Sequence, residues 1–259
     1  MDQTDLIIDN QLEPRRRRVI DCWQWLAAAF ALFRGAPLAW LALSSLLIVM
    51  TLIVMLIPVL GAIVSAVLMP GLLASFVAAA REQQNTGRTP QIADLFAGLR
   101  HQPVPLIRVG LYYFVLMTVV MLLLTQLVEA TLPAELLAKL NDPKTSPEQI
   151  PELLAYWPLA LTIFASLLLV YSSYFFAPQL VLLQGLRPGE AMKLSLLAFW
   201  RNLLPLCAMG VLGLGLIVIG SLPWLLGLLV VFPVLMLTNY TIYASVFEPN
   251  STIPTGVSA

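Results

Sequence analysis

The chain has 259 residues, of which 59% are hydrophobic and only 11% are charged, and its formal net charge is zero. Soluble domains carry about 25% charged residues, and one water-soluble domain of this size cannot bury so much apolar surface. The balanced charge also argues against nucleic acid as a partner, because binding to phosphates needs a basic surface. Residues 35–80 and 202–247 contain no Asp, Glu, Lys or Arg. A spanning helix needs about 20 apolar residues, so each segment predicts a helical hairpin in a membrane.

The N-terminal part of the chain combines a polar segment, a short helix and the first hairpin. Residues 1–18 end in four arginines and are expected to be a flexible tail without a cleavable signal peptide. Residues 19–33 have helical apolar spacing but are too short to span, which predicts a helix lying at the membrane interface. A first span is expected over residues 37–57, and a second span ends near residue 80.

The middle of the chain repeats this order with one long insertion. A polar loop over residues 81–88 is followed by a helix start, with Thr89 as the N-cap and Pro90 at the first helical position. This second short helix leads into a span over residues 103–128. Residues 129–152 form a polar loop broken by prolines, and a continuous fourth span is expected over residues 154–182.

The C-terminal part again contains a short helix and a hairpin. Residues 190–201 have an apolar face, which predicts a third interfacial helix. Spans five and six are expected over residues 203–219 and 223–247. The last residues, 248–259, are polar and are expected to form a second flexible tail.

The distribution of basic residues orients this six-span arrangement. Twelve of the fourteen Lys and Arg residues fall in the regions that a six-span chain places on one side of the membrane. The loop over residues 129–152 lies on the opposite side and is mainly acidic. By the positive-inside rule, both termini face the cytoplasm and this loop is periplasmic.

The chain also reads as three units, residues 19–80, 89–182 and 188–247, each with an interfacial helix followed by a hairpin. Each short helix ends in a bulky apolar residue and an arginine, with proline three or four residues later. A unit with two spans returns to its starting side, so the three copies must be parallel about an axis along the membrane normal. The alternative is independent use of a favourable interface junction.

Two sets of residues are candidate sites. The junction arginines Arg34, Arg100 and Arg201 lie where they can reach lipid phosphates. Polar residues in spans three, four and six are candidates for lining a cavity that takes a headgroup or small solute. The alternative is that they form hydrogen bonds between helices and an interfacial tyrosine belt. The candidate cavity residues are Tyr112, Tyr171, Ser173, Tyr174, Asn239 and Tyr240.

Metal-ligand spacing, nucleophile motifs and phosphate-binding loops are missing from the sequence. Cys22 and Cys207 are far apart and His101 is the single histidine, so no metal or cofactor site is expected.

Residues 23–40, 176–178, 185–201 and 240–247 carry a likeness that extends over most of residues 19–247. On these segments the chain resembles a family of uncharacterised proteobacterial inner-membrane proteins with six helices. The family is distantly similar to the membrane domain that accompanies some glycerophosphoryl diester phosphodiesterases. The resemblance implies an inner-membrane location. The phosphodiesterase catalytic domain has no counterpart in this sequence, so the resemblance implies no enzymatic role.

We therefore expect an all-α, six-span protein of a Gram-negative inner membrane without enzymatic activity. The leading hypothesis is a scaffold or accessory subunit that contacts anionic lipid headgroups, with membrane lipids, another membrane protein or a second copy as partners. The alternative is a transporter or channel for a small neutral or amphiphilic solute. A water-filled cavity that reaches Tyr174 and Asn239 would favour the alternative, and a dry, closely packed bundle would favour the scaffold.

Overall fold

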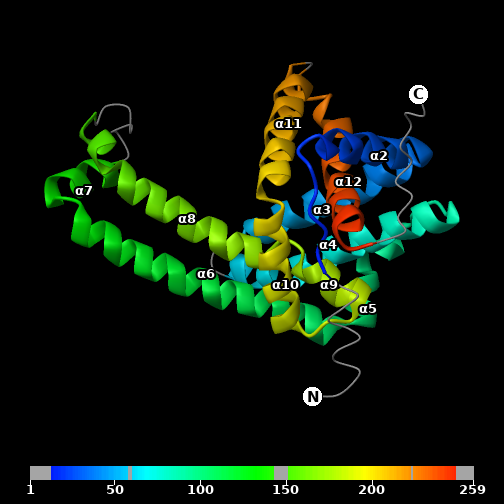
Figure 1. Cartoon of the computed structure of the whole chain (residues 1–259), viewed down its shortest axis with the longest axis horizontal. Helices are drawn as coiled ribbons and strands as arrows, with labels where there is room; N and C mark the ends of the chain where they lie inside the picture. The colour runs from blue at the N-terminus through cyan, green and yellow to red at the C-terminus, as the bar shows by residue number, and fades with distance from the viewer. Residues whose placement is uncertain (1–12, 58–59, 143–150, 223, 249–259) are drawn as a thin grey trace.

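The computed structural model describes residues 13–57, 60–142, 151–222 and 224–248, and these residues form helices without any strand. The short helices are α2 (Asp21–Gly35), η1 (Ile92–Phe96), α5 (Ala97–His101), α7 (Ala134–Asn141), η3 (Pro151–Tyr156) and α10 (Pro188–Arg201). The long helices are α3 (Pro37–Met55), α4 (Leu60–Thr86), α6 (Pro103–Thr131), α8 (Trp157–Tyr174) continued by α9 (Ala177–Gln184), α11 (Leu203–Ser221) and α12 (Leu228–Phe247). Figure 1 shows the whole arrangement.

Six segments are long and apolar enough to cross a bilayer: α3, α4, α6, α8 with α9, α11 and α12. The all-α, six-span fold is therefore confirmed. Their outward faces expose large apolar side chains, as expected for surfaces that meet lipid. The largest fully buried side chains gather instead where the short helices meet the ends of the spans. They include Trp25, Trp40, Phe76, Tyr240 and Tyr243.

The short helices are arranged in a cyclic order that matches the predicted repeat. Each one packs against the second span of another unit: α2 against α12, η1 with α5 against α4, and α10 against α8 and α9. A hydroxyl group also forms a hydrogen bond across each of these three contacts. The bonds are Thr241 Oγ1 to the Trp25 carbonyl (3.0 Å), the Gly98 N–H to Ser75 Oγ (2.7 Å), and Ser195 Oγ to the Ser172 carbonyl (2.8 Å).

The junction between each short helix and its following span also has a shared geometry. One non-helical residue separates the two helices: Ala36 (φ −152°, ψ 63°), Gln102 (φ −138°, ψ 56°) and Asn202 (φ −118°, ψ 23°). Proline follows the first two and disfavours helical geometry for the residue before it. The carbonyl of each junction residue accepts a hydrogen bond from the backbone N–H four residues later in the chain, at 3.1, 3.3 and 3.0 Å respectively. The predicted repeat therefore extends to backbone conformation.

The cyclic order is incomplete at one place. Span α6 packs closely on α4, and α3 contacts α12, but the equivalent pairing of α11 with α8 and α9 has no comparable packing among the described residues. Figure 1 shows the α6–α8 hairpin extending away from α11 and α12. The third interface between units is thus left open.

Two boundaries at the end of the first hairpin differ from the prediction. Residues 81–86, predicted as loop, are the last turns of α4. They are helical because Gln83 is buried, where its amide oxygen accepts from Trp40 Nε1 (2.7 Å) and its nitrogen donates to the Leu32 carbonyl (3.1 Å). The next helix begins at Ile92 rather than at Pro90, because the Asp94 carboxylate accepts from the Gln91 N–H (2.8 Å) at its start.

The segment before α2 is held against the other end of the chain. The Arg15 N–H donates to the Val246 carbonyl (3.0 Å), and the Arg17 N–H donates to Asn202 Oδ1 (2.7 Å). The Arg17 side chain donates from Nε to the Ser245 carbonyl (2.8 Å), and burial lowers the pKa of its guanidinium. The tail predicted over residues 1–18 is therefore anchored at Arg15 and Arg17, while residues 1–12 lie outside the described residues.

Other polar contacts mark the remaining ends of the hairpins. Arg81 Nε lies 2.9 Å from a carboxylate oxygen of Glu248, and burial raises the pKa of that carboxyl although Arg81 opposes the shift. In the loop predicted over residues 129–152, Lys139 on α7 lies 3.8 Å from Glu152. The tail predicted over residues 248–259 lies outside the described residues except for Glu248.

Candidate ligand cavity at the broken fourth span

The fourth span is broken between α8 and α9, where a continuous helix was predicted. Pro178 has no N–H to bond to the Tyr174 carbonyl, which weakens the helix at this point. Ser195 of α10 occupies the gap: its hydroxyl accepts from the Phe176 N–H (2.9 Å) and donates to the Ser172 carbonyl (2.8 Å). Non-helical backbone at membrane depth is tolerated where protein groups satisfy it in this way.

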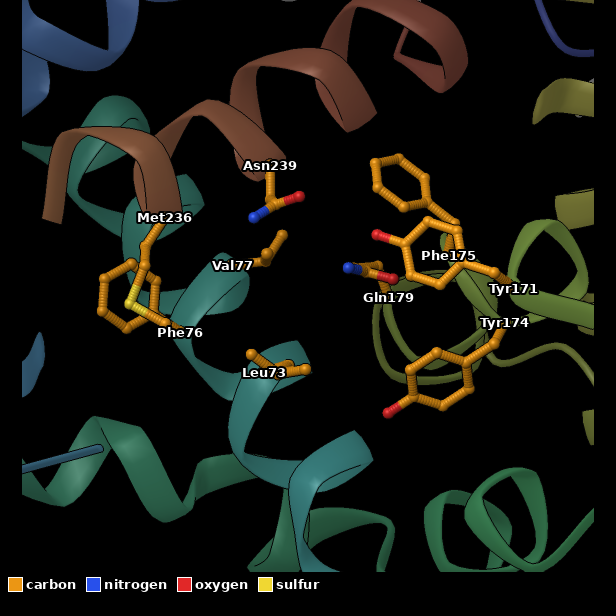
Figure 2. Close-up of a pocket in the computed structure, with 9 residues that line it drawn as sticks. All are labelled: Leu73, Phe76, Val77, Tyr171, Tyr174, Phe175, Gln179, Met236 and Asn239. Atoms are coloured by element: carbon orange, nitrogen blue, oxygen red, sulfur yellow. The ribbon is translucent and has the colours of Figure 1, made fainter. Parts of the chain in front are cut away.

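A cavity of about 140 Å³ lies beside this break. An apolar cavity of about this size admits a benzene-sized molecule, so a small polar head fits the space. Its walls come from α4, from α8 and α9, and from α12, as Figure 2 shows. The lining residues are Leu73, Phe76, Val77, Tyr171, Tyr174, Phe175, Gln179, Met236 and Asn239.

Three polar groups face the cavity. Figure 2 shows the Tyr171 hydroxyl directed toward the space between Asn239 and Gln179. With its amide nitrogen facing the break, Gln179 donates to the carbonyls of Phe175 (3.2 Å) and Phe176 (3.0 Å). Neither the Tyr171 hydroxyl nor the Asn239 amide has a hydrogen-bond partner among the described residues. Both groups are therefore available to a ligand.

The candidate cavity residues from the sequence divide into two groups. Tyr171, Tyr174 and Asn239 line the cavity together, and the Tyr174 ring packs on the Tyr113 ring at 4.4 Å between centroids. The other three lie elsewhere. Ser173 donates to the Val170 carbonyl of its own helix (2.7 Å), Tyr112 is 47% exposed on α6, and Tyr240 is buried in the core. Gln179, another polar residue of the predicted fourth span, also lines the cavity.

An apolar groove of about 460 Å³ adjoins the cavity. It lies between α8, α10, α11 and α12, at the interface that the cyclic order leaves open. The groove and the cavity share Tyr171, Phe175 and Asn239 in their walls, and no charged side chain lines either space within the described residues. Its other lining residues are Phe199, Leu206, Cys207, Met209, Gly210, Gly213, Leu214, Ile217, Leu235, Thr238 and Ile242.

The three junction arginines occupy equivalent positions away from this cavity. Arg34, Arg100 and Arg201 lie in the last turns of α2, α5 and α10, and all three are exposed. A cation is favourable at a helix C-terminus because of the helix dipole. Arg34 also lies over the ring of Phe30, 5.3 Å from its centroid.

The described residues contain no group of three or more His, Cys, Asp or Glu side chains suited to a metal ion. Cys22 is buried and Cys207 is exposed, and neither is in a disulfide. Comparison with protein-family models, curated proteins and solved structures found no match to this chain. The family resemblance drawn from the sequence therefore stays a prediction.

Proposed function

We propose that this protein is a non-enzymatic protein of the bacterial inner membrane that binds an amphiphilic molecule within the plane of the bilayer. The observation that supports the proposal is a cavity with unpartnered polar groups that shares three wall residues with an apolar groove. Ligand sites combine apolar walls with a few placed polar groups in this way. The arrangement favours binding or transport of an amphiphilic solute over the closely packed scaffold.

Tyr171 and Asn239 supply the recognition in this proposal. A hydroxyl and an amide can each donate and accept, and both lie in the cavity wall beside the apolar groove. One hydrogen bond contributes about 0.5–1.5 kcal/mol, which corresponds to an affinity change of about two- to tenfold. Removing either group should weaken binding by this amount.

Photolabelling in lipid nanodiscs tests the proposal. The probes are a monoacylglycerol and a phosphatidylglycerol, each with a diazirine in the acyl chain. We expect at least one to label residues 207–213 and 235–242 saturably, and excess unlabelled lipid to compete. Tyr171→Phe and Asn239→Leu should each reduce this labelling about two- to tenfold.

Tyr112→Phe is the matched control, because it removes the same hydroxyl from an exposed position on α6 outside the cavity. It should leave the labelling unchanged. Labelling by neither probe, or labelling that cannot be saturated, would contradict the proposal.

A second candidate function is adhesion to anionic lipid through the junction arginines. Their exposed, equivalent positions in the three units support it. A basic side chain near an anionic surface contributes about 1 kcal/mol, so the triple change of Arg34, Arg100 and Arg201 to Gln should remove most retained phosphatidylglycerol. Mass spectrometry of the co-purified lipid measures this loss. Lys139→Gln on α7 is the control. If both variants retained equal amounts of phosphatidylglycerol, the junction arginines would not be the lipid-binding residues.

A further inference from the structure

We propose that the bound molecule is a lipid with an uncharged, hydroxyl-bearing head, whose acyl chain lies in the groove between α8 and α11. The head would occupy the cavity at Tyr171 and Asn239. This inference rests on the proposed function and specifies the chemical class of its ligand.

The cavity walls argue for an uncharged head. A charged group moved away from water needs a paired charge or several donors, and no charged residue lines the cavity or the groove within the described residues. The available groups are the Tyr171 hydroxyl, the Asn239 amide and the amide oxygen of Gln179. Such groups match the hydroxyl and ester oxygens of an acylglycerol, whereas a phosphate would lack a cationic partner.

The groove walls argue for a hydrocarbon chain. Leucine, isoleucine, methionine and phenylalanine supply eight of the fourteen lining residues, and the single methionine, Met209, can adapt its shape to a flexible apolar partner. Two glycines of α11 keep the groove open. A Cβ atom at Gly210 would meet nothing within 4 Å, and one at Gly213 would lie 3.4 Å from Leu235.

The position of the groove gives such a chain a route from the bilayer. In the other two units the equivalent interface is filled by α6 against α4 and by α3 against α12. Among the described residues, α11 does not pack against α8 and α9 in this way. The groove therefore lies at the place where α11 would contact α8 and α9 if the third interface matched the other two. A lipid chain entering sideways would complete the apolar packing of the third interface.

Cys207 provides a direct readout, because it lines the groove and is exposed while Cys22 is buried. The full chain in nanodiscs is titrated with 1-monooleoylglycerol or with 1-oleoyl lysophosphatidate, and reaction of Cys207 with N-ethylmaleimide is followed by mass spectrometry. The two lipids share one chain and differ in the phosphate. We expect the neutral lipid to protect Cys207 at a concentration lower by about tenfold or more.

Two variants test whether the acyl chain of the lipid lies in the groove. Gly210→Leu adds a side chain at a position that lines the groove, where a Cβ atom would meet nothing within 4 Å, and should abolish lipid-dependent protection. Gly215→Leu introduces the same side chain into open space outside the groove lining and should leave protection intact.

The possible contradictions are separable. Equal protection by both lipids would overturn the uncharged head and leave the proposed function standing. Protection that persists in Gly210→Leu, or photolabelling without any protection of Cys207, would overturn the chain's place in the groove. Absence of both photolabelling and protection would overturn the proposed function together with this inference.

Discussion

Replacing Gly110 with alanine should strongly lower the thermal stability of the protein. A Cβ atom at this position of α6 would lie 1.8 Å from the Ala66 carbonyl oxygen and 2.8 Å from Pro70 Cγ, both on α4. Backbone atoms cannot rotate out of the way as a long side chain can, so α6 and α4 would have to separate. Overpacking of this kind costs about 1–3 kcal/mol, measured as a lower unfolding temperature in detergent.

Gly215→Ala is the matched control for this prediction. A Cβ atom at Gly215 on α11 would meet nothing within 4 Å. Alanine is favoured over glycine in a helix by about 1 kcal/mol, so this variant should be as stable as the parent or more stable. Similar destabilisation by the two substitutions would contradict a close approach of α4 and α6.

The spans were predictable because length and apolar composition are properties of each segment alone. The three short helices were also predictable, since apolar spacing indicates each helix and the recurring arginine and proline mark its C-terminal end. Residues 81–86 were assigned wrongly as loop because the partners of Gln83, Trp40 and the Leu32 carbonyl, lie far away in the sequence. From the sequence alone, a polar segment is assigned to a loop, because the buried groups that bond its side chains are not visible in the sequence.

The cavity was only partly predictable for a similar reason. The search for polar residues in apolar spans selected Tyr171, Tyr174 and Asn239, and these three lie together in the cavity lining. The same criterion selected Ser173 and Tyr240, because composition does not tell which face of a helix meets a neighbour. The open interface beside α11 could not be predicted at all, since the sequences of the three units suggest equivalent packing.

The break in the fourth span leads to the second prediction of large effect. Ser195→Ala should destabilise the protein and weaken photolabelling of the groove. The Ser195 hydroxyl accepts a hydrogen bond from the Phe176 N–H and donates one to the Ser172 carbonyl. The substitution removes both bonds and leaves these two buried backbone groups without their partner. An unsatisfied buried polar group costs about 1–3 kcal/mol, which should appear as a lower unfolding temperature.

The backbone has one way to recover this loss: the Phe176 N–H can bond directly to the Ser172 carbonyl, which would straighten α8 into α9. Straightening would move Tyr171 and Gln179 relative to Asn239, so the ligand groups would no longer meet even where stability is restored. Ser166→Ala is the control, because that exposed hydroxyl bonds only the Thr162 carbonyl of its own helix (2.8 Å). If Ser195→Ala kept both stability and labelling at the level of Ser166→Ala, the hydroxyl would not maintain the break. If Ser195→Ala lost labelling but kept its stability, the break between α8 and α9 would be needed to position the cavity residues and not to stabilise the fold.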